Sequence, residues 1–183
     1  PLVAFSGGSL GFLAPFAVPD DVSLLQTMLQ PCFGDDPWPV SLRMRLSCSV
    51  TATAGPARAK HAALNEVVLD RGPSPSLAAG DRLCNDEDFT TVQADGLIVA
   101  TPTGSTAYSL AAGGPLVHPA SPAVVLTPIC AHSLSFRPMV FPDSAHLRFV
   151  VQDDARAPAW VTFDGRRRCK LEHGDSLEVT VSP

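Results

Sequence analysis

Residues 95–108, DGLIVATPTGSTAY, run from an apolar segment through a turn rich in hydroxyl groups into an alanine-containing stretch. The apolar residues 97–100 predict a buried strand, and a short helix is expected from about Thr106 to Ala112. The glycines and proline of residues 113–115 are typical of a helix C-terminus. Helix starts carry unpaired N–H groups that bind phosphate or sugar oxygens. An ordinary strand, turn and capped helix explains the stretch equally well, so both interpretations stay open.

The sequence on both sides of this stretch predicts mainly β structure. Residues 42–50 alternate apolar and polar side chains, which indicates a half-buried strand, and residues 62–70 predict another. Further strands are expected at 89–92, 124–126, 147–151, 160–163, 167–171 and 177–181. Short strands with frequent turns favour an antiparallel β-sandwich, in which Asp164-Gly165 forms a two-residue hairpin turn.

The first 38 residues have a different character. Residues 2–5 predict a strand, and Asp20-Asp21 can cap a helix from about Val22 to Leu29. Several prolines follow, and we expect a boundary near Trp38. The chain opens as the inside of a strand without a methionine, so we expect it to be part of a longer protein.

Composition narrows the functional classes. The 183 residues, 45% of them hydrophobic, suffice for one sizeable core, and a net charge of −5 gives no basic footprint for nucleic acid. The five cysteines, without a C-x-x-C pair, favour reduced thiols in an intracellular protein over a disulfide framework or a zinc site. No run reaches the ~20 apolar residues that span a bilayer. The basic run 166–168 favours a solvated strand or turn over a contact to phosphates.

Two polar groups stand out as candidates for binding. Asn65 and Glu66 are adjacent in an apolar strand, so one of them faces inward and needs a partner. A carboxamide can recognise a base or ribose edge, and a carboxylate accepts from ribose hydroxyls, although neighbouring strands could satisfy both groups. In the turn, Thr103 and Thr106 supply hydroxyls, and Tyr108 could stack on a ring.

A serine hydrolase is a weaker alternative. Residues 7–11 match the G-x-S-x-G nucleophile elbow, with Ser9 as nucleophile and Asp164 and His173 as possible partners. The elbow must lead directly into a helix, which Pro15 interrupts. The β-rich remainder also lacks the alternating helices of that fold.

Taken together, these segments closely resemble the NAD kinase family, and in particular its eukaryotic-type branch. The matching stretches are GSLGFL at 8–13, LNEVV at 64–68, DGLIVATPTGSTAY at 95–108, GGP at 113–115, the loop 127–138 and FDG at 163–165. The resemblance extends over nearly the whole chain. It implies transfer of the terminal phosphate of ATP to the 2′-hydroxyl of the adenosine ribose of NAD, which gives NADP.

The resemblance also implies a fold and a set of partners. Residues 1–38 would be a remnant of an N-terminal α/β domain with its linker, and residues 39–183 an NAD-binding β-sandwich. NAD or NADP would bind here, and the complete enzyme would use ATP and Mg²⁺ and form a homo-oligomer. We expect an intracellular protein, cytoplasmic or in an organelle, with no nucleic-acid or membrane partner.

Carried over by motif, the substrate contacts are polar or small residues of three segments. They are Asn65, Glu66, Asp95, Thr103, Thr106, Ala107, Tyr108 and Asp164. No metal ligand is implied within the chain. The family's G-G-D-G motif, whose glycines cradle ATP and whose aspartate takes the proton from the 2′-hydroxyl, does not occur in these 183 residues. No catalytic residue is therefore assigned, and a non-catalytic module for NAD(P) binding or subunit association is the main alternative.

We predict that the 183-residue chain alone has little or no NAD kinase activity. Phosphoryl transfer depends on positioning and on charge stabilisation at the moving phosphate, and the phosphate cradle is not encoded here. The measurement is NADP formation from NAD and ATP, with a complete NAD kinase as positive control. Turnover by the purified chain would contradict the prediction.

Overall fold

The computed structural model describes residues 3–6, 13–14, 16–34, 40–53, 55, 57–73, 78–84, 87–88, 92–131, 136–155 and 157–182. Side chains are described for all of these except residues 78–93. The chain divides into two compact units, Pro1–Leu42 and Arg43–Pro183. The expected boundary near Trp38 lies outside the described residues, as do most of the GSLGFL stretch and Ser9. The assignment of residues 1–38 to a domain remnant stays a prediction.

The first unit contains few regular elements. Strand β1 (Phe5–Ser6) pairs in parallel with β2 (Phe16–Ala17), and helix α1 (Val22–Leu29) is followed by the 3-10 turn η1 (Gln30–Phe33). Asp21 caps α1 by accepting a hydrogen bond from the Ser23 backbone N–H at 2.8 Å. The predicted helix 22–29 is confirmed, whereas the predicted strand 2–5 is observed only at Phe5–Ser6.

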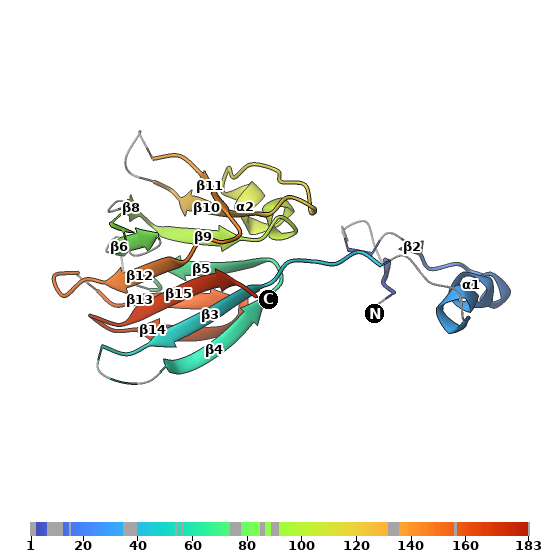
Figure 1. Ribbon diagram of the computed structural model, residues 1–183, viewed down its shortest axis with the longest axis horizontal. Coiled ribbons are helices and arrows are strands. Elements are labelled where there is room, and N and C mark those ends of the chain that lie inside the picture. Colours follow the sequence, from blue (N-terminus) through green and yellow to red (C-terminus); the bar gives the residue numbers. More distant parts are fainter. Residues whose placement is uncertain are drawn as a thin grey trace. The chain divides into compact units, whose positions relative to one another are not determined.

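The second unit consists of two antiparallel sheets (Figure 1). The six-stranded sheet has the order β11 (Met139–Pro142), β10 (Ala123–Ile129), β9 (Gly96–Ala100), β5 (Glu66–Asp70), β13 (Ala159–Phe163) and β14 (Arg166–Leu171). The seven-stranded sheet has the order β4 (Ala57–Ala63), β3 (Leu46–Thr51), β15 (Ser176–Val181), β12 (Leu147–Val151), β6 (Ala78–Cys84) and β7 (Glu87–Asp88), with β8 (Val92–Ala94) beside β6. The mainly β, antiparallel fold is therefore confirmed.

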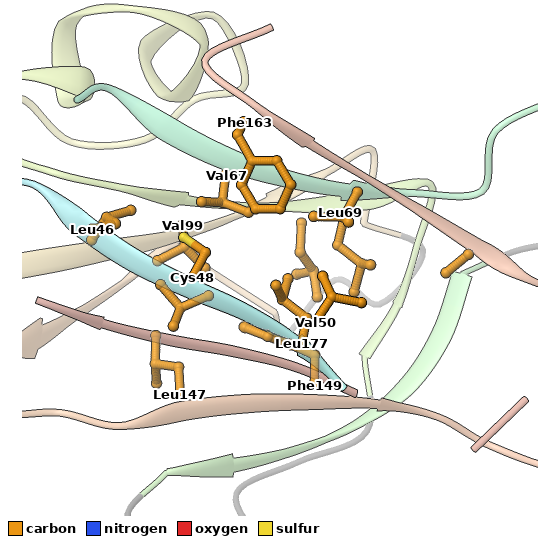
Figure 2. Packing of buried hydrophobic residues seen from close by; sticks show 14 of the residues in the cluster. Leu46, Cys48, Val50, Val67, Leu69, Val99, Leu147, Phe149, Phe163 and Leu177 are labelled. Atoms are coloured by element: carbon orange, nitrogen blue, oxygen red, sulfur yellow. The ribbon is translucent and has the colours of Figure 1, made fainter. Parts of the chain in front are cut away.

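The main core lies between the two sheets and follows the period-two rule. In β3, Leu46, Cys48 and Val50 point inward while Ser47 is exposed. They pack with side chains of the other sheet such as Val67 and Phe163 (Figure 2). Each fully buried side chain of this kind contributes roughly 1.5–3 kcal/mol.

A second, smaller cluster covers part of the opposite face of the six-stranded sheet. Val68, Ile98, Ala100 and Val125 form it, and partly buried residues such as Val117 pack on top. Strand β9 is consequently buried on both faces, which explains its continuous apolar sequence. The outer face of the sheet, away from the main core, therefore has its own short layer of covering residues.

Several predicted boundaries are wrong. The expected strand 62–70 is two strands, because the chain leaves β4 in the seven-stranded sheet, bends at Leu64-Asn65 and enters β5 in the other. The alternation at 42–50 forms a strand only from Leu46. The expected helix 106–112 is a 3-10 turn η2 (Gly104–Thr106) followed by the single-turn helix α2 (Tyr108–Ala111). Near 89–92 the structure has β7 and β8, and residues 89–91 lie outside the described residues.

The turn that follows β9 packs directly on the bend between β4 and β5. The Thr101 hydroxyl donates to the Leu64 carbonyl at 2.6 Å, and the Thr101 N–H donates to the Asn65 carbonyl at 2.9 Å. A Cβ atom on Gly104 would overlap the Asn65 carbonyl group. Glycine is required here because another segment of the backbone approaches it.

We predict that Gly104→Ala destabilises the fold by about 3 kcal/mol, because the new methyl group meets backbone atoms that cannot rotate away. Gly113→Ala is the matched control. It has open space around it and a φ of +85°, so it should cost only about 1 kcal/mol. Urea unfolding followed by circular dichroism measures both, and equal losses would contradict the proposed contact.

Candidate functional site

A pocket of about 340 Å³ lies on the outer face of the six-stranded sheet. It is lined by Glu66, Val68, Asp70, Arg71, Gly72, Asp95, Tyr108, Ile129, Thr162, Gly165 and Arg168. Val68 and Ile129 give it an apolar floor. Charged residues of both signs surround this floor, so the pocket is more polar than a typical small-molecule site and suits a polar or charged ligand.

Strand periodicity explains which residues of β5 reach the pocket. Val67 and Leu69 point into the main core, so Glu66, Val68 and Asp70 point to the outer face. Strand β13 pairs with β5, with Thr162 opposite Val68, and adds Thr162 to the same face. Tyr108 reaches the pocket from α2.

Glu66 is the most unusual group of the pocket. It is only 7% exposed, and its Oε2 atom has no hydrogen-bond partner. Burial raises the pKa of the Glu66 carboxyl, and the negative charge of Asp164 raises this pKa further, while a hydrogen bond from the Tyr108 backbone N–H acts in the opposite direction. An unpaired, buried carboxylate oxygen in a pocket can accept a hydrogen bond from a ligand.

Asp164 shapes the segment that carries Glu66. Its carboxylate accepts hydrogen bonds from the backbone N–H groups of Leu64, Asn65 and Glu66 at 2.8, 2.8 and 3.1 Å. The φ angles of Asp164 and Gly165 are both positive, 48° and 66°, as a type I′ hairpin turn requires, so the predicted turn is confirmed. The side chain of Asp164 is thus committed to the bend and does not line the pocket.

The far end of the pocket contains two ion pairs. Arg71 Nε lies 3.3 Å from Asp95 Oδ1, and Arg168 Nη2 lies 3.2 Å from Asp70 Oδ1. All four side chains are partly exposed, so each pair contributes little to stability, about 0–1 kcal/mol. Both pairs line the pocket, so a ligand there meets positive and negative side chains.

The structure brings together three of the eight predicted contact residues, Glu66, Asp95 and Tyr108, as pocket-lining side chains. The other five are Asn65, Thr103, Thr106, Ala107 and Asp164, and they belong to the bend or to the turn beside it. Thr103 is buried, and its carbonyl accepts a hydrogen bond from the Thr106 hydroxyl at 3.0 Å. The four-residue helix α2 is too short to act as an anion-binding helix start.

Sequence reasoning missed several lining residues, above all Asp70, Arg71 and Arg168. Two signals could have found them. The period of two in β5 places Asp70 on the same face as Glu66. The basic run at 166–168 puts a cation on the edge strand beside β13.

The geometry contradicts the serine hydrolase alternative. Asp164 and His173 lie at opposite ends of β14, which separates them by roughly 20 Å. His173 Nε2 is also hydrogen-bonded to the Ala155 carbonyl at 2.8 Å. An acid and a histidine so far apart cannot act on one serine.

The described residues also bear on metal, disulfide and membrane sites. No group of three His, Cys, Asp or Glu side chains is arranged to hold a metal ion there. The cysteines whose side chains are described, Cys32, Cys48, Cys130 and Cys169, are all free thiols. Over the same residues, no helix has the length and apolar character needed to cross a membrane.

The fold and the pocket define a two-sheet β-sandwich domain with a charged pocket on the outer face of one sheet. The sequence model of the ATP-NAD kinase C-terminal domain matches residues 64–183. The chain belongs to the NAD kinase family.

Individual relatives agree with this assignment. The chain is 48% identical over 184 residues to NAD kinase 2, chloroplastic, of Arabidopsis thaliana. This alignment covers 100% of the chain and 19% of the relative. It is 44% identical over 197 residues to the ATP-NADH kinase YEF1 of Saccharomyces cerevisiae, covering 100% of the chain and 39% of the relative. The chain thus spans less than half of either relative.

Solved structures share the fold. The crystal structure of yeast NADH kinase complexed with NADH superposes with a TM-score of 0.87 at 36% identity, covering 99% of this chain and 51% of that one. An NAD kinase from Archaeoglobus fulgidus in complex with ATP has a TM-score of 0.72 at 23% identity, covering 94% of this chain and 61% of that one. The second comparison supports the fold alone.

We predict that Glu66→Gln stabilises the fold at neutral pH. Because the folded-state pKa of Glu66 is raised, the folded protein binds the proton more tightly, and stability falls as pH rises from the ordinary glutamate pKa through the raised one. Glutamine removes this loss. The variant should be more stable at pH 8 by about 1 kcal/mol or more, since an unpaired buried charge costs more than an unpaired neutral group.

Urea unfolding between pH 4 and pH 8 measures the effect. The difference from wild type should shrink as the pH falls toward 4. Asp154→Asn, at an exposed acid outside the pocket lining, is the control and should follow the wild-type curve. A Glu66→Gln variant that is less stable than wild type at pH 8 would refute the prediction.

Proposed function

We propose that the pocket binds the adenosine portion of NAD or NADP, and that the complete protein is an NAD kinase that phosphorylates the 2′-hydroxyl of NAD with ATP. The observation that carries the proposal is the unpaired Oε2 atom of the Glu66 carboxylate, which lines one pocket together with Asp95 and Tyr108. Membership of the NAD kinase family supports the substrate class.

Each part of the pocket suits a part of a nucleoside. The Glu66 carboxylate can accept hydrogen bonds from ribose hydroxyls, which would supply the partner its Oε2 atom lacks. Tyr108 is 46% exposed, so its ring can stack on the adenine. Val68 and Ile129 provide an apolar surface in the same pocket. The pocket volume of about 340 Å³ is at the low end for ligand sites and suits part of a dinucleotide better than the whole molecule.

The other contact residues are proposed as the frame of the same site. Asn65 and Asp164 fix the bend that delivers Glu66 to the pocket, and Thr103, Thr106 and Ala107 form the turn that delivers Tyr108. This role is supported by their hydrogen bonds to backbone groups. Direct contact of any of these five residues with the dinucleotide is a further proposal from the family resemblance.

The proposed contribution of this chain to phosphoryl transfer is positioning. Holding the ribose through Glu66 would fix where the 2′-hydroxyl lies, and positioning supplies much of the catalysis of this reaction. ATP would bring its phosphate with Mg²⁺, and the described residues hold no cluster of three His, Cys, Asp or Glu side chains that could bind the metal. No residue here is assigned as the proton acceptor.

Two further proposals concern the oligomeric state and the cellular location of the protein. Self-association into a homo-oligomer is supported only by the family resemblance. An intracellular location is supported by the four free thiols. The Arabidopsis relative is named as chloroplastic, which leaves an organelle among the candidate compartments.

As the family resemblance implies, we propose that Asp95, which lines the pocket, also makes a polar contact to the dinucleotide. We predict that Asp95→Ala weakens NAD binding to the 183-residue chain by about tenfold or more, since a hydrogen bond to a charged group contributes roughly 1.5–3 kcal/mol. Isothermal titration calorimetry with NAD and NADP measures the affinities. The control is Asp154→Ala, at an exposed acid that does not line the pocket. Equal affinities for wild type and Asp95→Ala, or no binding by wild type, would overturn the proposal.

A further inference from the structure

The end of the pocket opposite Glu66 is organised around Arg168. This residue lies on the edge strand β14, its side chain is 47% exposed, and it lines the pocket. Its guanidinium carbon lies 4.6 Å from the centre of the Trp160 ring. Stacking on an aromatic ring restricts the guanidinium plane without using its N–H groups, so the donors stay available.

Trp160 also lies against the turn at Gly72. Gly72 lies so close that a Cβ atom there would overlap the indole ring, and its φ of +59° favours glycine as well. The Gly72 N–H donates to Asp70 Oδ1 at 2.6 Å. Arg168 shares this same oxygen at 3.2 Å. Trp160, Gly72 and Asp70 therefore form one connected unit around the Arg168 guanidinium.

The pairing with Asp70 leaves most of the binding capacity of Arg168 unused. A guanidinium carries five N–H donors, and within the described part of the chain one is engaged, at 3.2 Å to a partly exposed carboxylate. Such an exposed pair is weak, so exchange or sharing of Arg168 with a second anion costs little. Arginine binds phosphate through two parallel N–H groups, which makes phosphate its best-matched ligand.

The charges at this end also permit an anion to bind. Asp70 and Asp95 would repel a phosphate, but each is paired with an arginine, Arg168 and Arg71 respectively, so the four groups have no net charge. Along β5, Glu66 and Asp70 are about 13 Å apart by strand rise. A ribose near Glu66 thus leaves the rest of the pocket for the groups that follow it in a nucleotide.

We propose that Arg168 binds the pyrophosphate of the dinucleotide, so that the pocket has a sugar end at Glu66 and a phosphate end at Arg168. This inference rests on the proposed function, because it assumes that adenosine occupies the pocket. It makes Arg168 a specificity-determining residue, which separates nucleotides with a pyrophosphate from the bare nucleoside.

The test is calorimetric titration of the 183-residue chain with adenosine and with ADP-ribose. Arg168→Ala should weaken ADP-ribose binding by about tenfold or more and leave adenosine binding unchanged. Arg168→Lys keeps the charge without the planar fork, so it should recover only part of the affinity. Arg166→Ala is the matched control, on the same edge strand but outside the pocket lining, and should bind both ligands like wild type.

The outcomes distinguish a failure of the phosphate end from a failure of the proposed function. If wild type binds ADP-ribose and Arg168→Ala binds it equally well, or if Arg168→Ala loses adenosine to the same degree, the phosphate end is wrong while the proposed function stands. If wild type binds neither ligand, the proposed function fails and the phosphate end fails with it. Thermal melting of each variant verifies that the fold is intact.

Discussion

The site depends on how one backbone bend is held, at Leu64-Asn65, where the chain crosses from the seven-stranded sheet to the six-stranded sheet. Backbone groups at such a crossing have no ladder partners, and leaving them unpaired in a partly buried place would cost about 1–3 kcal/mol each. The Asp164 carboxylate accepts from three successive N–H groups on one side of the bend. Thr101 engages the Leu64 and Asn65 carbonyls on the other side. Two turns distant in sequence thereby fix the residue at which β5 begins.

The position of that first residue determines the chemistry of the outer face. Because β5 begins at Glu66, the period of two sends Glu66, Val68 and Asp70 outward, and a shift of one residue would send them into the apolar core. The covering layer lies over β9, β10 and the middle of β5, where Ile98, Val125 and Val68 are buried. It leaves the side toward β13 and β14 open. The pocket is therefore the uncovered part of a face whose remainder is a second core.

The sequence was sufficient for the fold class because apolar alternation, as in Leu46, Cys48 and Val50, reflects local backbone geometry. Family motifs mark Glu66, Asp95 and Tyr108, and the structure places all three in one pocket, while their contact with a substrate stays a prediction. Strand ends were less predictable. Residues 62–70 read as one strand, since an apolar run carries no sign of a bend whose partners, Thr101 and Asp164, lie far along the chain. Arg168 was interpreted as solvated for the same reason: only the pairing of β14 with β13 and β5 brings it beside Asp70, and no local pattern contains that information.

The bend also creates a conflict that a ligand can resolve. The charge of Asp164 builds the segment that carries Glu66, yet it raises the Glu66 pKa, as burial does more strongly. Folding alone would favour a neutral residue at this position, because the buried Oε2 atom has no partner. A hydroxyl that donates to the carboxylate would stabilise its charged form and lower its pKa. Ionisation of Glu66 and binding of a sugar are then coupled. The same carboxylate that lowers the stability of the domain without ligand is the group that accepts the hydrogen bond of the sugar.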